Sequence, residues 1–143
     1  MLSQTAEYAL RAVLHLAREG GRGPVRVDDI AAALDVPRNY LSKILHVLAR
    51  AGILESTRGP HGGFELAHPA GDLTLADVVE EFDPLKESAS CLLGRRRCDD
   101  RTPCSAHARW KEVAETVRSF FRETTVAELA GIPGQEALEL PVA

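Results

Sequence analysis

The first fifty residues place apolar side chains at helical spacing among polar ones, and this pattern predicts three helices. The first runs from a cap at Ser3 to about Glu19. A second, short helix begins with Asp28 or Asp29 as its cap, and a tight turn at residues 35–37 leads into the third. The third helix carries short, basic side chains opposite its apolar residues. The pattern therefore predicts a helix-turn-helix.

The periodicity changes after residue 52, where the sequence predicts a β-hairpin. Residues 53–56 and 64–67 have the composition of short strands, and the segment 57–63 between them is rich in glycine and holds one arginine. A helix-turn-helix followed by such a hairpin has the order of a winged helix. We therefore expect a mainly α fold with a small β-hairpin as the wing.

Two further helices are expected after the hairpin. Thr74 caps a helix that reaches Phe82, and a long helix from about Ser105 to Thr124 is followed by a short helical turn. The long helix bears an apolar stripe too large for a small winged domain to cover, which favours a symmetric dimer. The stripe consists of Trp110, Val113, Val117, Phe120 and Phe121. The expected parts of the chain are a winged helix-turn-helix domain (1–82), a cysteine loop (83–104), a dimerisation helix with its terminal turn (105–130) and a flexible tail (131–143).

Composition narrows the class of protein. With 143 residues, 45% of them hydrophobic, the chain is long enough for one cooperative core. Its apolar stretches are shorter than the about 18 residues of a membrane span, and its start lacks a signal-peptide pattern, so we expect a cytoplasmic protein without a membrane segment. The net charge is −4, but residues 1–70 hold eight basic and seven acidic residues, against nine and fourteen in 71–143. The N-terminal half is therefore the better candidate for a DNA-binding face.

The expected DNA-binding residues lie on the third helix and the hairpin tip. A helix fits the major groove, where Asn39 and Ser42 can meet base edges, and the wing glycines allow Arg58 to approach the minor groove or a phosphate. The candidates are Arg38, Asn39, Tyr40, Ser42, Lys43, Arg58, Gly59, Pro60, His61 and Gly62. Two alternatives stay open: the module binds another protein, and Tyr40 packs in the core instead of contacting phosphate.

A second candidate site lies where the helical pattern stops. Cys91, Cys98, Cys104 and His107 follow the spacing C-x6-C-x5-C-x2-H, and the chain has no other cysteine. Three cysteines in a reducing compartment favour metal or redox chemistry over disulfides. Thiolates with a histidine suit an iron–sulfur cluster; zinc is the alternative metal, although only Cys104 and His107 have the close spacing of a zinc pair. Redox-active thiols without a metal are a further alternative.

Four stretches together have a specific combination of motifs. They are Tyr8-Ala9-Leu10, Asn39-Tyr40-Leu41, Arg58-Gly59-Pro60-His61-Gly62-Gly63-Phe64, and the three cysteines with His107, Ala108 and Trp110. Because of these four stretches, residues 1 to about 130 resemble the IscR/NsrR-type family of iron–sulfur winged helix-turn-helix transcription regulators. Two features differ from the IscR branch: the first cysteine gap is one residue longer, and Ser42 stands in place of a glutamate.

The resemblance implies a homodimer that binds a pseudo-palindromic site on double-stranded DNA, with an affinity that changes with the state of its cluster. Cys91, Cys98, Cys104 and His107 match the positions that hold a [2Fe-2S] cluster in the IscR branch. In the NsrR branch three cysteines and a carboxylate from the other subunit hold a [4Fe-4S] cluster, and Glu7 occupies that carboxylate position. We favour His107 and [2Fe-2S] because His107 is followed by the IscR-like Ala-x-Trp.

The expected function is a repressor or dual regulator that senses iron–sulfur, redox or nitric oxide status. The sequence contains no glycine-rich nucleotide loop, no nucleophile with its base and no convincing carboxylate pair, so an enzyme is not expected. The alternatives are a zinc-stabilised or thiol-based winged-helix regulator and an iron–sulfur electron carrier. An electron carrier fits less well because it has no need of a recognition helix.

Overall fold

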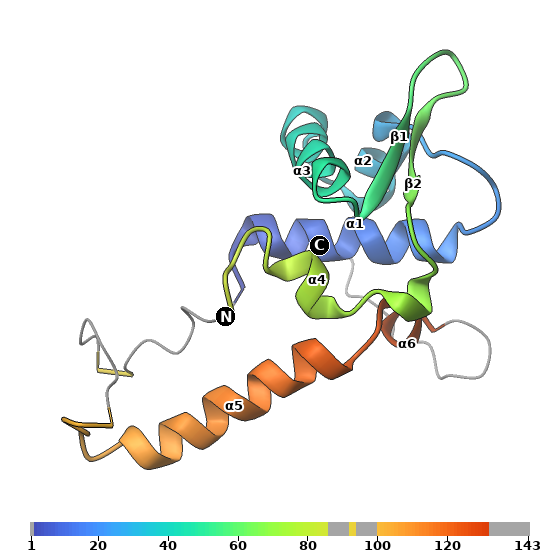
Figure 1. Ribbon diagram of the computed structural model, residues 1–143. Helices are drawn as coiled ribbons and strands as arrows, with labels where there is room; N and C mark the ends of the chain where they lie inside the picture. Colours follow the sequence, from blue (N-terminus) through green and yellow to red (C-terminus); the bar gives the residue numbers. More distant parts are fainter. Residues whose placement is uncertain (1, 86–91, 94–99, 132–143) are drawn as a thin grey trace.

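The computed structural model describes residues 2–85, 92–93 and 100–131 (Figure 1). The described part is mainly helical, with one two-stranded antiparallel sheet, which confirms the predicted fold class. Its elements in order are α1 (Gln4–Arg18), α2 (Val27–Leu34), α3 (Arg38–Arg50), β1 (Leu54–Thr57), β2 (Gly63–Leu66), the 3-10 turn η1 (Ala70–Asp72), α4 (Leu75–Val79), α5 (His107–Glu123) and α6 (Val126–Ala130).

Helix α1 runs through the middle of the molecule. It has α2, α3 and the hairpin on one side and α4 and α6 on the other (Figure 1). The Ser3 hydroxyl accepts a hydrogen bond from the Ala6 amide at 3.1 Å, so the predicted cap is confirmed. Fully buried alanines such as Ala9 and Ala12 allow the surrounding elements to approach α1 closely.

The start of α2 differs from the prediction, because neither Asp28 nor Asp29 caps the helix. The backbone N–H and C=O of Val25 pair with Phe64 in the wing at 2.9 and 2.8 Å, which holds Val25 extended. The next carbonyl, that of Arg26, accepts from the Asp29 amide at 3.1 Å. The helix therefore begins directly after this bridge, and both aspartates lie in its first turn, where the helix dipole favours negative charge.

The tight turn between α2 and α3 is confirmed. Asp35 adopts a left-handed conformation with φ 52° and ends α2, and its amide donates to the Ala32 carbonyl. Val36 turns inward and is 5% exposed, and Pro37 directly precedes α3. Fixed φ at Pro37 favours the start of a helix at this point.

The wing is a hairpin whose strands lie one residue closer to its tip than predicted. Leu54 pairs with Leu66, and Thr57 pairs with Gly63, so the connecting loop is only 58–62. Glycine is required at the last loop position, because a Cβ on Gly62 would lie 2.1 Å from the Thr57 carbonyl oxygen. The hairpin can therefore close tightly only without a side chain at residue 62.

Helix α4 begins as predicted and ends early. Thr74 and Asp77 form a reciprocal capping box. The helix ends at Val79, not at Phe82, and a turn follows in which the amides of Phe82 and Asp83 both donate to the Val79 carbonyl. The Leu75 amide donates to Thr124 at 3.0 Å, which ties α4 to the end of α5.

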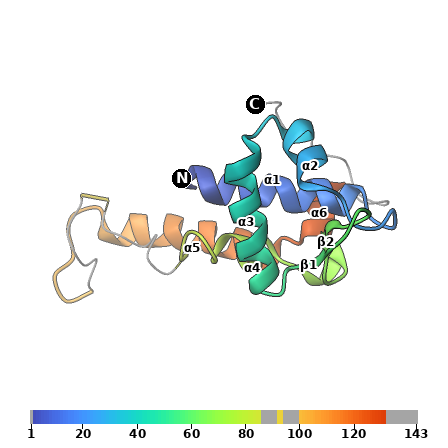
Figure 2. The ribbon, with the colours of Figure 1, turned by 90° about the horizontal axis from the view of Figure 1, so that it is seen from above.

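Helix α5 extends away from the other helices, as Figure 2 shows from above. It begins at His107, two residues later than predicted, and α6 follows after Thr125, whose side chain caps it. Of the predicted apolar stripe, Phe121 is buried, whereas Val113 and Phe120 are 50% and 52% exposed. None of the described helices combines the length and apolar character needed to cross a membrane.

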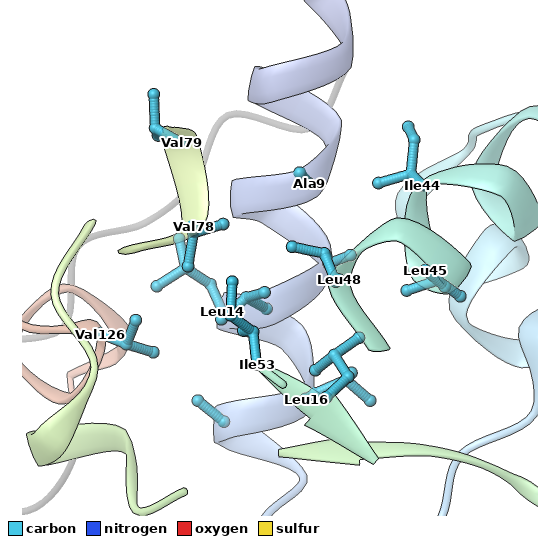
Figure 3. Close-up of a cluster of buried hydrophobic side chains, with 14 of the residues drawn as sticks. Ala9, Leu14, Leu16, Ile44, Leu45, Leu48, Ile53, Val78, Val79 and Val126 are labelled. Carbon is cyan, nitrogen blue, oxygen red and sulfur yellow. The ribbon is translucent and has the colours of Figure 1, made fainter. Parts of the chain in front are cut away.

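The hydrophobic core lies on both sides of α1 (Figure 3). Apolar side chains of α3 and of the segment before β1 pack on one side, and those of α4 and α6 pack on the other. The labelled residues include Ile44, Leu45 and Leu48 on the first side, Val78, Val79 and Val126 on the second, and Ala9, Leu14 and Leu16 on α1 itself. This packing fixes α3 on the body and leaves its polar face outside.

Candidate nucleic-acid interface and cysteine loop

The polar face of α3 lies opposite the buried face. Leu41, Ile44, Leu45 and Leu48 are buried, whereas the predicted DNA-binding residues Arg38, Asn39 and Lys43 are exposed and Ser42 is half-buried. The imidazole of His46, one turn further along, packs edge-on against Phe64 of the wing, with ring centroids 5.4 Å apart. Helix α3, the predicted recognition helix, and the wing are therefore packed against each other.

The wing tip presents the remaining candidates. Arg58, Gly59, Pro60 and His61 are exposed, and Gly62 is buried in the turn. Gly59 has φ 104°, a conformation that glycine adopts far more readily than other residues. Gly62 thus shapes the loop from within, and the exposed residues form the surface that a nucleic acid can reach.

A groove separates the wing from the start of α2 and α3, with a volume of about 400 Å³. Arginines enter it from three elements: Arg26 before α2, Arg38 at the start of α3 and Arg58 at the wing tip. Such a groove is positively charged where a phosphate backbone or a base edge would approach. The wing and the recognition helix therefore share one basic surface, which we call the wing groove.

Arg26 was not among the residues predicted from the sequence. It is the N-cap residue of α2 and makes no capping side-chain hydrogen bond. The bridge between Val25 and Phe64 brings this arginine beside the wing. A cue was present in the sequence, since a basic residue before the first helix of a helix-turn-helix can reach phosphate, but its position next to Arg58 depends on folding.

Arg38 has a protein partner in the wing groove. Its Nε donates to the carboxylate of Asp28, on the first turn of α2. Both side chains remain more than half exposed, at 58% and 57%. The contact fixes the direction of the guanidinium and adds little to folding, because exposed ion pairs are typically worth less than about 1 kcal/mol.

Tyr40 faces the first helix of the body. Its hydroxyl forms a hydrogen bond with the Thr5 hydroxyl, and its ring meets Tyr8 edge-on with centroids 5.8 Å apart. The Arg11 guanidinium lies over the Tyr8 ring and donates to the Leu34 carbonyl at 2.9 Å. This cluster connects α1 with the ends of α2 and α3, and it gives Tyr40 a structural role beside any contact with phosphate.

Only part of the predicted ligand set lies in the described residues. Cys91 and Cys98 lie outside them. Cys104 has a free, half-buried thiol, and its carbonyl accepts a hydrogen bond from the His107 amide at 3.0 Å, so Cys104 lies in the turn that leads into α5, which begins at His107. Within the described part of the chain, no group of three or more histidine, cysteine, aspartate or glutamate side chains is arranged to hold a metal ion.

His107 is joined to two charged neighbours. Its Nε2 lies 2.8 Å from Oδ1 of Asp100, and the Lys111 ammonium lies 3.1 Å from the same oxygen. The hydrogen bond with His107 and the adjacent Lys111 hold the pKa of the Asp100 carboxyl below its usual value. Asp100 therefore stays ionised and orients the imidazole, as carboxylates do beside histidine ligands of metals.

Glu7, the alternative ligand, lies on the first turn of α1 and is exposed. A carboxylate is favoured at this position by the helix dipole alone. The described part of a single chain does not bring Glu7 into a set with Cys104 and His107.

Comparison with known proteins gives matches over nearly the whole chain. The family Rrf2, described as an iron-dependent transcriptional regulator, matches residues 2–131. A putative HTH-type transcriptional regulator of Aquifex aeolicus is 35% identical over 134 residues, 92% of each chain. The HTH-type transcriptional regulator IscR of Vibrio atlanticus is 30% identical over 139 residues, covering 97% of this chain and 79% of that protein.

A solved structure has the same fold. The global cysteine regulator CymR of B. subtilis superposes with a TM-score of 0.76 at 24% identity, over 91% of this chain and 95% of that one. At this identity the similarity concerns the fold alone. The arrangement of helices and wing described above is thus also found in an experimentally determined regulator.

Proposed function

The chain belongs to the Rrf2 family of transcriptional regulators, and we propose that it is a homodimer that senses iron–sulfur, redox or nitric oxide status through a cluster held by its cysteine loop. It is a DNA-binding regulator and not an enzyme. Because a regulator of transcription acts on the chromosome, we expect this protein in the cytoplasm. The observation that carries the proposal is that one chain joins a basic wing groove to a thiol and an imidazole, Cys104 and His107, in the turn that leads into α5.

The wing groove and the polar face of α3 form the DNA-binding surface. Asn39, Ser42 and Lys43 project from α3 away from the core, where a major groove can receive the helix. Arg58 extends from the wing tip toward the minor groove or a phosphate. Gly59, Pro60 and His61 allow the backbone of the tip to approach the duplex, and Gly62 keeps the turn closed.

The cluster ligands are Cys91, Cys98, Cys104 and His107. The donor set fits, because thiolates with one imidazole suit an iron–sulfur cluster, and Asp100 orients His107. When bound, such a cluster supplies a redox-active and nitric-oxide-reactive centre. We favour [2Fe-2S]; a [4Fe-4S] cluster with Glu7 of a second subunit as fourth ligand is the alternative. The half-buried positions of Cys104 and His107 limit the access of water to their side chains.

The ends of the cysteine loop are anchored to the DNA-binding body and to α5. At the start of the loop, Leu85 is 4% exposed, and the Asp83 carboxylate accepts a hydrogen bond from the Ser3 amide at 2.6 Å. After the loop, α5 begins at His107. A change in ligation would thus act on the start of α1, whose residue Thr5 contacts Tyr40 of the recognition helix. This gives the signal a physical connection to the DNA-binding surface.

The dimer would form along α5. Val113 and Phe120 are exposed, large and apolar, on a helix that extends away from the body. A second copy of the same helix would cover them, and a two-fold axis would place two recognition helices about 34–36 Å apart, in successive major grooves of a pseudo-palindromic site.

The test is anaerobic purification of the full chain from iron-replete cells. We expect a brown or red protein with stoichiometric iron and sulfide. It should also enrich, from a random library of about 30 base pairs, one pseudo-palindromic duplex, which we call the selected duplex. Stoichiometric zinc without colour would support the zinc-stabilised regulator. A protein that contains neither iron nor zinc would support the thiol-based regulator. Colour without any preferred DNA would instead support the electron carrier.

A further inference from the structure

The wing groove contains one carboxylate among its arginines. Of the described residues that line it, Asp28 is the only acidic one. A negative charge here opposes the approach of DNA phosphates. The carboxylate beside the three arginines therefore does not serve to raise the affinity for DNA. Since the pair that it forms with Arg38 is exposed, the carboxylate does not serve folding stability either.

The contact between the two residues involves one particular nitrogen. Asp28 accepts from Nε of Arg38, whereas end-on bidentate recognition of guanine uses the two terminal nitrogens of a guanidinium. A carboxylate on Nε thus fixes the plane of the group and directs its terminal edge away from α2. Arginine contacting O6 and N7 of guanine is the commonest specific contact in the major groove, and its discrimination depends on this orientation.

We propose that Asp28 is a specificity-determining residue, which holds Arg38 in position to read a guanine in the major groove and weakens binding to DNA that lacks this base. The proposal rests on the DNA-binding surface described above. At a site with the guanine, the contact of Arg38 with the base offsets the repulsion between Asp28 and the nearby phosphates. At other sites only the repulsion remains, so binding there is weaker.

The experiment compares Asp28→Asn with Asp29→Asn, its matched control. Asp29 is the next residue on the same helix turn, is exposed and does not line the groove, so its substitution removes the same charge without weakening the contact with Arg38. Both variants should lose a similar, small amount of stability, because both carboxylates are exposed and lie in the same first turn of α2. Binding to the selected duplex and to a random-sequence duplex is measured at one salt concentration, and each variant is used in a new selection.

We expect Asp28→Asn to bind the random duplex more tightly and the selected duplex no better, so that the ratio of the two affinities falls at least about fivefold. The new selection should lose its preference at one guanine in each half-site. Asp29→Asn should keep both the ratio and the preference. Arg38→Ala should itself lose the preference for that guanine. Adding Asp28→Asn to Arg38→Ala should then have no further effect on the preference.

Equal changes in Asp28→Asn and Asp29→Asn, with the guanine retained, would show that Asp28 acts only through its charge and would overturn the proposal. An unchanged preference in Arg38→Ala would overturn it as well. A parent protein that enriches no duplex would overturn the DNA-binding surface itself, which distinguishes that failure from a failure of the Asp28 proposal.

Discussion

The hydroxyl of Tyr40, on the recognition helix, forms a hydrogen bond with the hydroxyl of Thr5, on the first turn of α1. The two residues are 35 positions apart in the chain, and the bond joins the helix that reads DNA to the helix that runs through the core. Edge-on packing of Tyr8 against the Tyr40 ring strengthens the same junction. The orientation of α3 therefore depends in part on this pair.

The first prediction concerns this hydrogen bond. Tyr40→Phe and Thr5→Ala should each lower the free energy of unfolding by about 0.5–1.5 kcal/mol, the usual net value of a hydrogen bond. The double variant should be only slightly less stable than either single one, because both remove one interaction. Chemical denaturation measures this. If Tyr40→Phe still weakens binding to the selected duplex in the Thr5→Ala background, the phenol also contacts phosphate.

The second prediction concerns the wing. Arg58→Ala should weaken binding to the selected duplex by about 1–3 kcal/mol, because an arginine in a groove contributes both charge and hydrogen bonds. Fluorescence anisotropy at fixed salt measures the change. Arg22→Ala is the control, since Arg22 is also exposed but lies in the loop after α1, where it pairs with Glu19. Equal affinities of the Arg58 variant and the parent would exclude the wing from DNA binding.

The third prediction separates phosphate contacts from base contacts on α3. Lys43 is exposed and is not among the residues that line the wing groove, so we expect it to meet phosphate. Lys43→Ala should weaken binding to all duplexes similarly and lower the slope of log affinity against log salt concentration by about one unit. Affinities measured over a series of salt concentrations give this slope. A slope identical to that of the parent would identify Lys43 as a base-reading residue or a bystander.

The periodic parts of the fold could be predicted from the sequence because local forces decide them. The cap at Ser3, the apolar side of α3 and the glycines of the hairpin depend on neighbours within a few residues. The start of α2 could not be predicted, because Val25 is held by Phe64 of the wing, which is far from it in the sequence. Without that contact Asp28 and Asp29 are good caps, and the local pattern is misleading.

The candidate site follows the same division. Residue types and spacing were enough to predict a recognition helix, a wing arginine and a cysteine segment as candidates. Neither the pairing of Arg38 with Asp28 nor the place of Arg26 beside the wing could be predicted, because each depends on how α2, α3 and the hairpin pack together. Asp100 was missed for a related reason, since an aspartate before α5 is unremarkable until its carboxylate is found next to His107.

The fourth prediction concerns the dimer. Phe120→Asp should give a monomer in sedimentation at micromolar concentration, because it places a charge on the exposed apolar face of α5. Arg122→Asp is the control: it also adds an acidic side chain, but it lies about 200° around the helix. The monomer should lose most of its affinity for the selected duplex, since one half-site remains unbound. A monomeric parent with full affinity would contradict the proposed dimer.

The fifth prediction concerns the cluster ligands. Cys91→Ser, Cys98→Ser and Cys104→Ser should each abolish the visible chromophore of the anaerobic protein, because each loses a thiolate that anchors the cluster and balances the charge of ferric iron. Ser105→Ala, next to Cys104 and exposed, is the control and should keep the colour. A chromophore that survives all three cysteine changes would contradict the ligand set.

The fourth ligand is decided by comparing His107 with Glu7. If His107 is the ligand, His107→Ala should bleach or shift the spectrum, Glu7→Gln should leave it nearly unchanged, and iron and sulfide should approach about two of each per subunit. The opposite pattern, with about four irons, would select a [4Fe-4S] cluster that Glu7 of a second subunit completes. Asp100→Asn should then separate the two cases further. It removes the carboxylate that orients His107, so it should shift the spectrum only where His107 is a ligand, whereas a cluster ligated by Glu7 should not respond to it.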